Sequence, residues 1–231
     1  MKFPYQLIDL THTLENSIPN WDNSCGFNHE LQLDYPDCQG EDKFRVMKLS
    51  MDAGIGTHMD APSHCVPGAK GIHEFDVNDL CMSCVVIDVS SKAHEHYRVS
   101  AEDINDFERR YGLIRQHTCV LIKTGWERFW REPLKYHNQH VFPSVSIEAA
   151  NLLLKRGVTA LGIDTLSPDC PEYGFKVHQA FLGAGKILLE NVANLESMPV
   201  TGALVMICPL KVLDGTEVPV RLLGLICLDS L

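Results

Sequence analysis

The segment GIGTHMDAPSH, residues 54–64, gathers side chains that can bind a divalent cation. If its THMD portion is extended, His58 and Asp60 lie two residues apart and therefore project to the same side of the strand. A turn at Pro62 would then bring His64 back towards them. An imidazole and a carboxylate on one side are suitable ligands for a single ion. Taken alone, the segment favours a surface loop or satisfied buried polar groups over a metal site, so further donors are needed.

Two further donors follow far along the chain. His178 lies in the expected helix KVHQAFLGAG, and Glu190 ends the apolar run KILLE. A carboxylate in that position is expensive to bury unless it is paired or coordinates a cation. Considered singly, an exposed helical histidine and a solvated glutamate at a strand end are the ordinary interpretation of these residues. Considered together with residues 54–64, they favour a metal site assembled from distant parts of the chain.

A mixed α/β core is expected to position these donors. Short runs rich in Val, Ile and Leu and bounded by Gly, Pro or Asn predict eight strands. Several runs are continuously apolar, which is typical of strands covered on both faces. The predicted strands are QLIDLTH (6–12), FRVMKLSMD (44–52), CVVIDVS (84–90), TCVLIKTG (118–125), TALGIDT (159–165), KILLENV (186–192), ALVMICPLKV (203–212) and PVRLLGLICL (219–228).

Three segments predict helices. Ser100 opens SAEDINDFERRYG with an acidic residue three positions later, which is a capping-box pattern, and Gly112 closes the segment. Ser146 opens SIEAANLLLKRG, which carries apolar residues at helical spacing and stops at Gly157. The third helix is KVHQAFLGAG. The succession of strand CVLIKTG, helix SIEAANLLLKRG and strand ALGID is typical of a βαβ unit.

The composition is that of an ordinary globular chain. Of 231 residues, 45% are hydrophobic and 22% are charged, and no repeat or long Pro/Gly/Ser linker divides them, so we expect one domain over residues 1–231. The formal charge of −10 disfavours nucleic acid and anionic membranes as partners. No run approaches the roughly 18 apolar residues of a membrane span, and the first residues show no apolar leader. We therefore expect a soluble, cytoplasmic protein.

The nine cysteines suit a reducing compartment better than a disulfide framework, because their number is odd and several lie in apolar runs. Cys81 and Cys84 form a lone CxxC, which could be a redox pair or half of a zinc site. No second CxxC accompanies them, so a structural role is favoured. Cys65 stands beside His64 but lacks a recognisable arrangement of base and orienting group, and it is also expected to be structural.

Several of these segments together resemble a known family. GTHMDAPSH and HQAFLGAGKILLEN, with DLTHTL near the start, TGW at 124–126, FPSVSIEAANLL and GVTALGIDT, are similar to the cyclase family of metal-dependent hydrolases, which includes kynurenine formamidases and isatin hydrolases. The similarity runs from about Asp9 to Asn194. It implies an α/β fold of the swivelling β/β/α type, a single domain of mixed β-sheet with packed helices, and a homo-oligomer, commonly a dimer.

The resemblance also implies roles for particular residues. His64 matches the family's proton donor and acceptor. Trp21 matches an aromatic residue that contacts substrate, although a core or loop tryptophan is an equal alternative because DNSCGF departs from the usual Trp-Pro-Gly context. The implied metal ligands are His58, Asp60, His178 and Glu190. Outside these positions, we expect solvated loop histidines at His94, His96, His137 and His140.

One position departs from the family's pattern. The formamidase motif begins HxGTH, and its leading histidine helps to hold one of two zinc ions, whereas this chain has Gly54 there. Without His58, the other implied ligands still make a three-ligand site with an open position, as catalytic zinc requires. His58 either completes that site or holds a weakened second ion, and Asp52 is a conceivable substitute ligand. We therefore expect one well-occupied ion, Zn²⁺ first and Mn²⁺ second.

This set of residues suggests hydrolysis. A divalent ion lowers the pKa of bound water to about 7 and polarises a carbonyl, and an imidazole can move the proton. The leading hypothesis is a hydrolase of a small amide, N-formyl aromatic or lactam, resembling kynurenine formamidase of tryptophan catabolism, with His64 as the proton shuttle. The second is a ring-opening lactam hydrolase of the isatin type. The third is a non-catalytic metal- or ligand-binding relative in which Gly54 marks a degenerate site.

Overall fold

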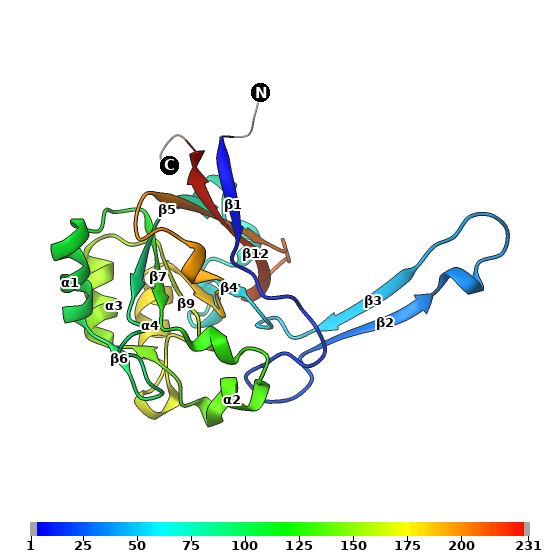
Figure 1. Ribbon diagram of the computed structural model, residues 1–231, viewed down its shortest axis with the longest axis horizontal. Coiled ribbons are helices and arrows are strands. Elements are labelled where there is room, and N and C mark those ends of the chain that lie inside the picture. Colours follow the sequence, from blue (N-terminus) through cyan, green and yellow to red (C-terminus); the bar gives the residue numbers. More distant parts are fainter. Residues whose placement is uncertain (1–3, 229–231) are drawn as a thin grey trace.

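The computed structural model describes residues 4–228, and its largest element is an eight-stranded sheet (Figure 1). The strands of this sheet are β1 (Tyr5–Asp9), β4 (His58–Asp60), β5 (Cys81–Asp88), β7 (Thr118–Lys123), β9 (Ala160–Ile163), β10 (Ile187–Glu190), β11 (Ala203–Pro209) and β12 (Glu217–Cys227). They are ordered β1-β12-β11-β5-β7-β9-β10-β4, and β12 also pairs with β4. Seven strands therefore close into a barrel-like mixed sheet, with β1 added at β12.

The strand predictions are confirmed, with additions. Each predicted run overlaps a strand of the structure; the run at 44–52 becomes β3 (Val46–Met51), which forms a separate hairpin with β2 (Phe27–Leu33). Strand β2 and the short parallel pair β6 (Arg98–Val99) and β8 (Ser144–Val145) were not predicted. The extended THMD segment, on which the site prediction depended, is β4.

The helix predictions are also confirmed. The three predicted helices are α1 (Ala101–Tyr111), α3 (Ile147–Lys155) and α4 (Lys176–Gly183). Ser100 and Asp103 form the expected capping box at the start of α1. Strands β7 and β9 are parallel neighbours joined through α3, as a βαβ unit requires. The short helix α2 (Pro133–His137) was not predicted. The α/β fold with a mixed sheet and packed helices is therefore as expected.

The continuously apolar strands are buried on both faces. In β7, Cys119 and Leu121 belong to a core cluster that also contains Met59 and Leu189. The alternate residue Val120 belongs to a second cluster, which packs beneath the helices. Helices α1 and α3 lie side by side over this second cluster, with α4 next to α3 (Figure 1). The period-2 alternation of a strand thus divides one apolar run between two cores.

The hairpin of β2 and β3 projects from the body as an arm (Figure 1). Its side chains are largely exposed, including apolar ones. Within residues 4–228, no helix combines the length and the apolar character that a membrane crossing needs.

All nine cysteines are free thiols; Cys84 is buried in β5 and Cys81 is exposed, so the two do not form a disulfide.

Candidate metal centre

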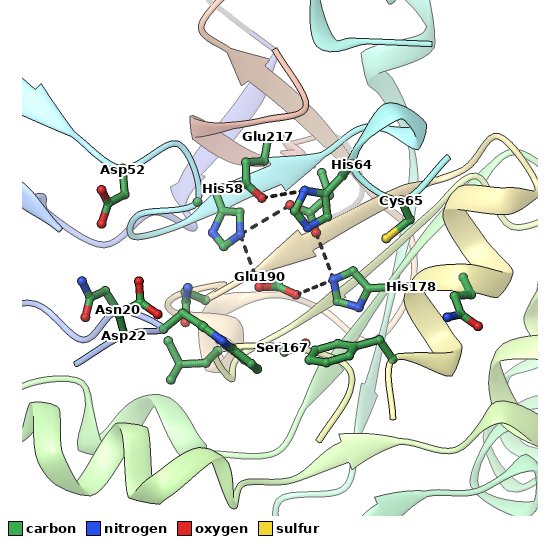
Figure 2. A pocket seen from close by; sticks show the side chains of 17 residues that line it. Asn20, Asp22, Asp52, His58, His64, Cys65, Ser167, His178, Glu190 and Glu217 are labelled. Atoms are coloured by element: carbon green, nitrogen blue, oxygen red, sulfur yellow. Dashed lines mark ion pairs between the residues drawn. The ribbon is translucent and has the colours of Figure 1, made fainter. Parts of the chain in front are cut away.

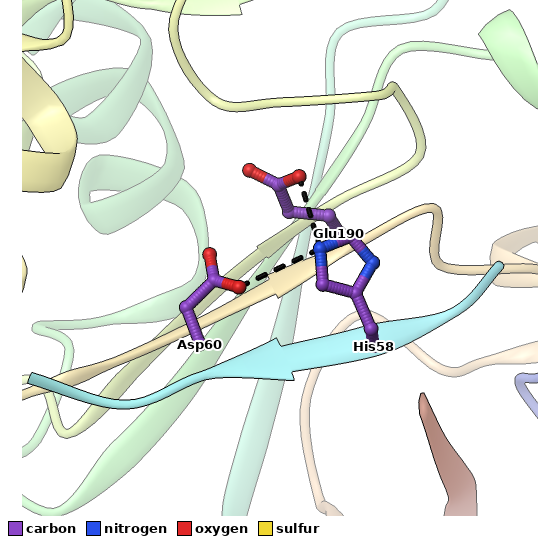
Figure 3. A group of neighbouring side chains, drawn as sticks. All are labelled: His58, Asp60 and Glu190. Atoms are coloured by element: carbon purple, nitrogen blue, oxygen red, sulfur yellow. Dashed lines mark ion pairs between the residues drawn. The ribbon is translucent and has the colours of Figure 1, made fainter. Parts of the chain in front are cut away.

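Strand β4 supplies two of the predicted donors. It lies between β10 and β12, so both of its edges are paired and its three residues are held buried. Alternation along this strand puts the side chains of His58 and Asp60 on one face, as predicted. Glu190 on β10 is the register partner of His58, which places its carboxylate on the same face (Figure 3).

These three side chains converge. His58 Nε2 lies 3.5 Å from Asp60 Oδ1 and 3.3 Å from Glu190 Oε2. One donor atom from each residue lies within 4.8 Å of the other two, and all three residues are buried. Convergence of an imidazole and two carboxylates is the arrangement that borderline divalent ions accept.

Helix α4 brings the fourth donor to the same carboxylates. His178 Nε2 lies 3.5 Å from Asp60 Oδ2 and 3.4 Å from Glu190 Oε1. Each carboxylate therefore directs one oxygen at His58 and the other at His178. Figure 2 shows this for Glu190. The structure thus brings together all four residues predicted as ligands, and their role as ligands stays a prediction.

Both imidazoles are fixed through their other nitrogen. His58 Nδ1 lies 2.9 Å from the carbonyl oxygen of Gly56, and His178 Nδ1 lies 2.8 Å from Asp169 Oδ2. If each Nδ1 donates to that oxygen, each Nε2 is left as a lone-pair donor facing the carboxylates. Histidines that bind metals are usually held in this way, by a carbonyl or carboxylate on the remote nitrogen.

The supporting residues were missed by sequence reasoning. Asp169 also accepts hydrogen bonds from the backbone N–H groups of Val177 and His178, so it holds the first turn of α4 as well as the imidazole. Asn191 donates its side-chain amide to the Gly56 carbonyl that orients His58. Asn191 stands inside the quoted motif GKILLEN, directly after Glu190. Asp169 lies in a loop with no periodic pattern, and no sequence signal identified it.

Burial and charge act against each other in this cluster. Burial alone would lower the pKa of His58, but the carboxylates of Glu190 and Asp60 outweigh it and raise the pKa to about 9. Burial is likewise outweighed at His178, whose pKa is raised by Asp169, Asp60 and Glu190. Burial would raise the pKa of Glu190, but contact with the two imidazoles lowers it. Because the carboxylates favour the protonated form of the two imidazoles, a cation that binds here would displace protons from them.

Two buried oxygens test whether a cation fits. Within residues 4–228, Asp60 Oδ1 and Glu190 Oε1 are buried and have no hydrogen-bond partner. The imidazole nitrogens that face them, at 3.5 and 3.4 Å, make ion-pair contacts but no hydrogen bond. A buried carboxylate oxygen without a hydrogen bond is costly, and a divalent cation at the centre of the four side chains would satisfy both. The donor set of two imidazoles and two carboxylates also suits Zn²⁺ or Mn²⁺. The residues present therefore fit the implied metal.

His64 stands at the edge of the same cluster. It lies in the short 3₁₀ turn Pro62–His64 directly after β4, so the turn at Pro62 does bring it back towards the donors. Its ring centroid is 6.0 Å from that of His178, and its side chain is one-third exposed. Its Nδ1 contacts Glu217 Oε2 at 3.0 Å. A partly exposed imidazole beside the donors is free to exchange protons with a bound molecule.

The cluster forms the floor of a cavity of about 570 Å³. Trp21 and Phe175 line one wall, with ring centroids 5.8 Å apart. Trp21 is fixed by its carbonyl oxygen, which lies 2.9 Å from His137 Nε2 and 2.8 Å from His140 Nε2. The expectation that His137 and His140 are solvated was wrong, because His137 is buried and His140 half-buried. The His140 ring lies against the Trp21 ring, and the His137 ring lies against that of His140. Trp21 thus lines the cavity and also packs against a core cluster that contains Ile18 and Ile55.

Gly54 lies beside the donors, where the resemblance implies a further ligand in formamidases. A Cβ atom at this residue would lie 3.4 Å from His58 Nε2 and 3.3 Å from the carboxylate of Glu217. A side chain there would therefore point at the donors, and glycine leaves that space open. Asp52 lines the cavity but is exposed and lies to the side of the imidazoles (Figure 2).

Burial raises the pKa of the Cys65 thiol, which disfavours a thiolate nucleophile.

Comparisons with known proteins found relatives that are named as hydrolases. Isatin hydrolase of Roseibium aggregatum is 28% identical over 186 residues, which cover 74% of this chain and 71% of that protein. Kynurenine formamidase of Bacillus cytotoxicus is 25% identical over 221 residues, covering 93% of this chain and 94% of that protein. The solved structure of isatin hydrolase A from Labrenzia aggregata bound to benzyl benzoate matches with a TM-score of 0.87 at 29% identity, covering 97% of this chain and 94% of that one.

The sequence model of the family described as "Putative cyclase" matches residues 8–170, which include β4, the turn with His64 and the βαβ unit. This match spans more than half of the 231 residues. The chain belongs to the cyclase family.

Proposed function

We propose that this protein is a metal-dependent hydrolase of a small amide, N-formyl aromatic or lactam, with the whole chain, residues 1–231, as one hydrolase domain. The observation that carries the proposal is the convergence of two oriented imidazoles on the same two buried carboxylates. The relatives named isatin hydrolase and kynurenine formamidase support this class of reaction.

Asp60, His178 and Glu190 would hold one well-occupied ion, Zn²⁺ first and Mn²⁺ second, with His58 completing the site or holding a weaker second ion. When bound, the ion supplies Lewis acidity, which polarises a carbonyl and makes water nucleophilic near neutral pH. The protein contributes the arrangement around it. Gly56 and Asp169 keep both imidazoles turned to the centre.

The residues around the cavity have separate tasks in this proposal. His64 takes a proton from the attacking water and delivers it to the leaving nitrogen, because an imidazole titrates close enough to neutrality to serve in both steps. Trp21 and Phe175 would hold an aromatic ring of the substrate against their own rings. A cavity of about 570 Å³ is within the range that binds small molecules.

Two substrate classes fit this arrangement. Kynurenine formamidase matches over 93% of the chain and supports an N-formyl aromatic amine, in which case the enzyme would act in tryptophan catabolism in the cytoplasm. The isatin hydrolase structure has a TM-score of 0.87 and supports a lactam opened at its ring amide. A degenerate, non-catalytic relative is disfavoured because the four donors and His64 are all retained and gathered.

Purified protein separates these hypotheses. We expect about one Zn²⁺ or Mn²⁺ per chain by elemental analysis, and metal-dependent turnover of N-formylkynurenine or isatin followed by ultraviolet absorbance. Chelator-treated protein should lose turnover and regain it on addition of the metal. Protein that holds the metal but turns over neither compound would favour the non-catalytic relative. Protein without bound metal would contradict the proposal as a whole.

We also propose that the chain forms a homodimer through the β2–β3 arm. Large apolar side chains on this arm are exposed to solvent, including Phe44 at 60%, Leu49 at 55% and Leu31 at 47%. An arm projecting from the body cannot bury these side chains against its own core (Figure 1). Several large exposed apolar side chains on one segment are typical of protein interfaces, and self-association is the partner that the family resemblance implies.

Substitution on the arm tests the dimer. Wild-type protein should elute as a dimer in size-exclusion chromatography with light scattering, and Leu49→Asp should shift it towards the monomer. Leu113→Asp is the matched control, because Leu113 is 72% exposed but lies on the body after α1. A monomeric wild type, or a Leu49→Asp protein that stays dimeric, would refute the role of the arm.

A further inference from the structure

Glu217 is a carboxylate at the site to which sequence reasoning gave no role. It is the first residue of β12, and the antiparallel register places it directly opposite Asp60 on β4. Directly opposed residues of an antiparallel pair have side chains on the same face of the sheet, and two like charges there are unfavourable. The fold therefore gains nothing from a carboxylate at this point unless a cationic or proton-donating group faces it.

His64 is that group. Its Nδ1 lies 3.0 Å from Glu217 Oε2, with the glutamate side chain about one-quarter exposed and the imidazole about one-third exposed. A partly exposed ion pair adds little to stability. The contact does fix the tautomer of His64. An acceptor at Nδ1 selects the form in which Nδ1 carries the proton and Nε2 carries the lone pair.

The position of Glu217 depends on the open space at Gly54. The carboxylate of Glu217 would lie 3.3 Å from a Cβ atom at that residue, which is closer than nearly all real contacts of this kind. Figure 2 shows Glu217 above and between His58 and His64, with its ion pair directed to His64. A longer side chain at position 54 would displace the Glu217 carboxylate. The ion pair between Glu217 and His64 therefore requires a glycine at this position.

We propose that Glu217 is a positioning residue for His64, and this inference rests on the proposed hydrolysis. Glu217 accepts the Nδ1–H bond, which leaves Nε2 as the base. As the oxygen of the attacking water bonds to the carbonyl carbon of the substrate, its O–H bond breaks and the proton goes to Nε2, and the resulting imidazolium keeps its Nδ1–H on Glu217. As the carbon–nitrogen bond of the substrate breaks, the same proton leaves Nε2 for the leaving nitrogen, and the neutral tautomer is restored.

A double-mutant cycle tests this dependence. Glu217→Ala should lower kcat about 10- to 100-fold, less than loss of the base itself, with KM and metal content close to wild type. In a His64→Ala background, Glu217→Ala should have no further effect, because a residue that acts only through His64 has nothing left to position. Glu217→Gln, which keeps an acceptor oxygen, should restore part of the rate. Asp214→Asn removes a charge from the exposed loop just before β12 and should leave kcat unchanged.

A readout independent of turnover completes the test. In ¹⁵N-labelled, metal-free protein near pH 8, the His64 ring should show the Nδ1–H tautomer, and Glu217→Ala should shift it towards the Nε2–H form. The inference would be overturned if the losses of kcat in Glu217→Ala and His64→Ala multiply in the double variant. It would also be overturned if the tautomer of His64 is the same in Glu217→Ala as in wild type. Loss of metal from Glu217→Ala would also overturn it, since Glu217 would then be a ligand. If wild-type protein hydrolyses neither compound while the tautomer still shifts, the proposed function fails and the positioning contact stands.

Discussion

Glu190→Gln is expected to remove the bound metal and with it all measurable hydrolysis. Glutamine has the same shape but no charge, and Glu190 is the group whose two oxygens lie 3.3 and 3.4 Å from His58 and His178. Loss of a residue that only supports a ligand weakens metal affinity about 10- to 100-fold. Loss of a ligand that faces both imidazoles should exceed that, and elemental analysis should find almost no metal after dialysis.

The same substitution should not unfold the protein. The amide keeps the size of the buried side chain, and the two imidazoles that it faces can lose their protons, so that no buried charge is left without a partner. Glu172→Gln, an exposed glutamate outside the cavity, is the control and should keep full metal content. A folded Glu190→Gln protein that retains one metal ion per chain with wild-type affinity would show that Glu190 is not a ligand.

His64→Ala should separate the two effects: the protein should keep its bound metal but lose its hydrolysis rate. The imidazole stands beside the four donors, with its ring centroid 6.0 Å from that of His178. General acid–base catalysis contributes about 10²- to 10⁴-fold, so kcat should fall by an amount in that range. Because the side chain is about one-third exposed, truncation should leave folding intact.

Metal titration and steady-state kinetics on the same preparation measure both effects. The metal affinity of His64→Ala should stay within a few-fold of wild type while kcat falls. Wild-type turnover in this variant would refute the role of His64 as proton shuttle. Loss of metal together with rate would instead place His64 among the ligands.

Local patterns in the sequence predicted most of the fold. Runs such as TCVLIKT are apolar at every position because β7 divides its side chains between two cores, and this leaves a clear signal. Strand β2, FNHELQL, gives no such signal, because it lies on the exposed arm and only Phe27, at its start, packs into a core cluster. Helix α2 has only five residues, too few to show helical spacing.

The candidate site was predictable where neighbours in sequence are neighbours in space. Alternation along β4 placed His58 beside Asp60, whereas the distant residues His178 and Glu190 were assigned to the same site through the resemblance to the cyclase family. Contacts created by tertiary structure were not predictable: Glu217 faces Asp60 only because β12 pairs with β4 to close the barrel. The histidines at 137 and 140 looked like polar loop residues, but the turn of the chain buries one and directs both at the Trp21 carbonyl.

Anomalous diffraction from crystals of wild-type protein grown with Zn²⁺ or Mn²⁺ tests the proposed metal centre most directly. Data collected on both sides of the metal absorption edge should give a strong peak bounded by the side chains of Asp60, His178 and Glu190, at about 2.0–2.2 Å from the donor atoms. A weaker second peak beside His58 would agree with the open space at Gly54. Crystals that contain the metal but show no peak among these side chains would contradict the metal centre and the hydrolysis derived from it.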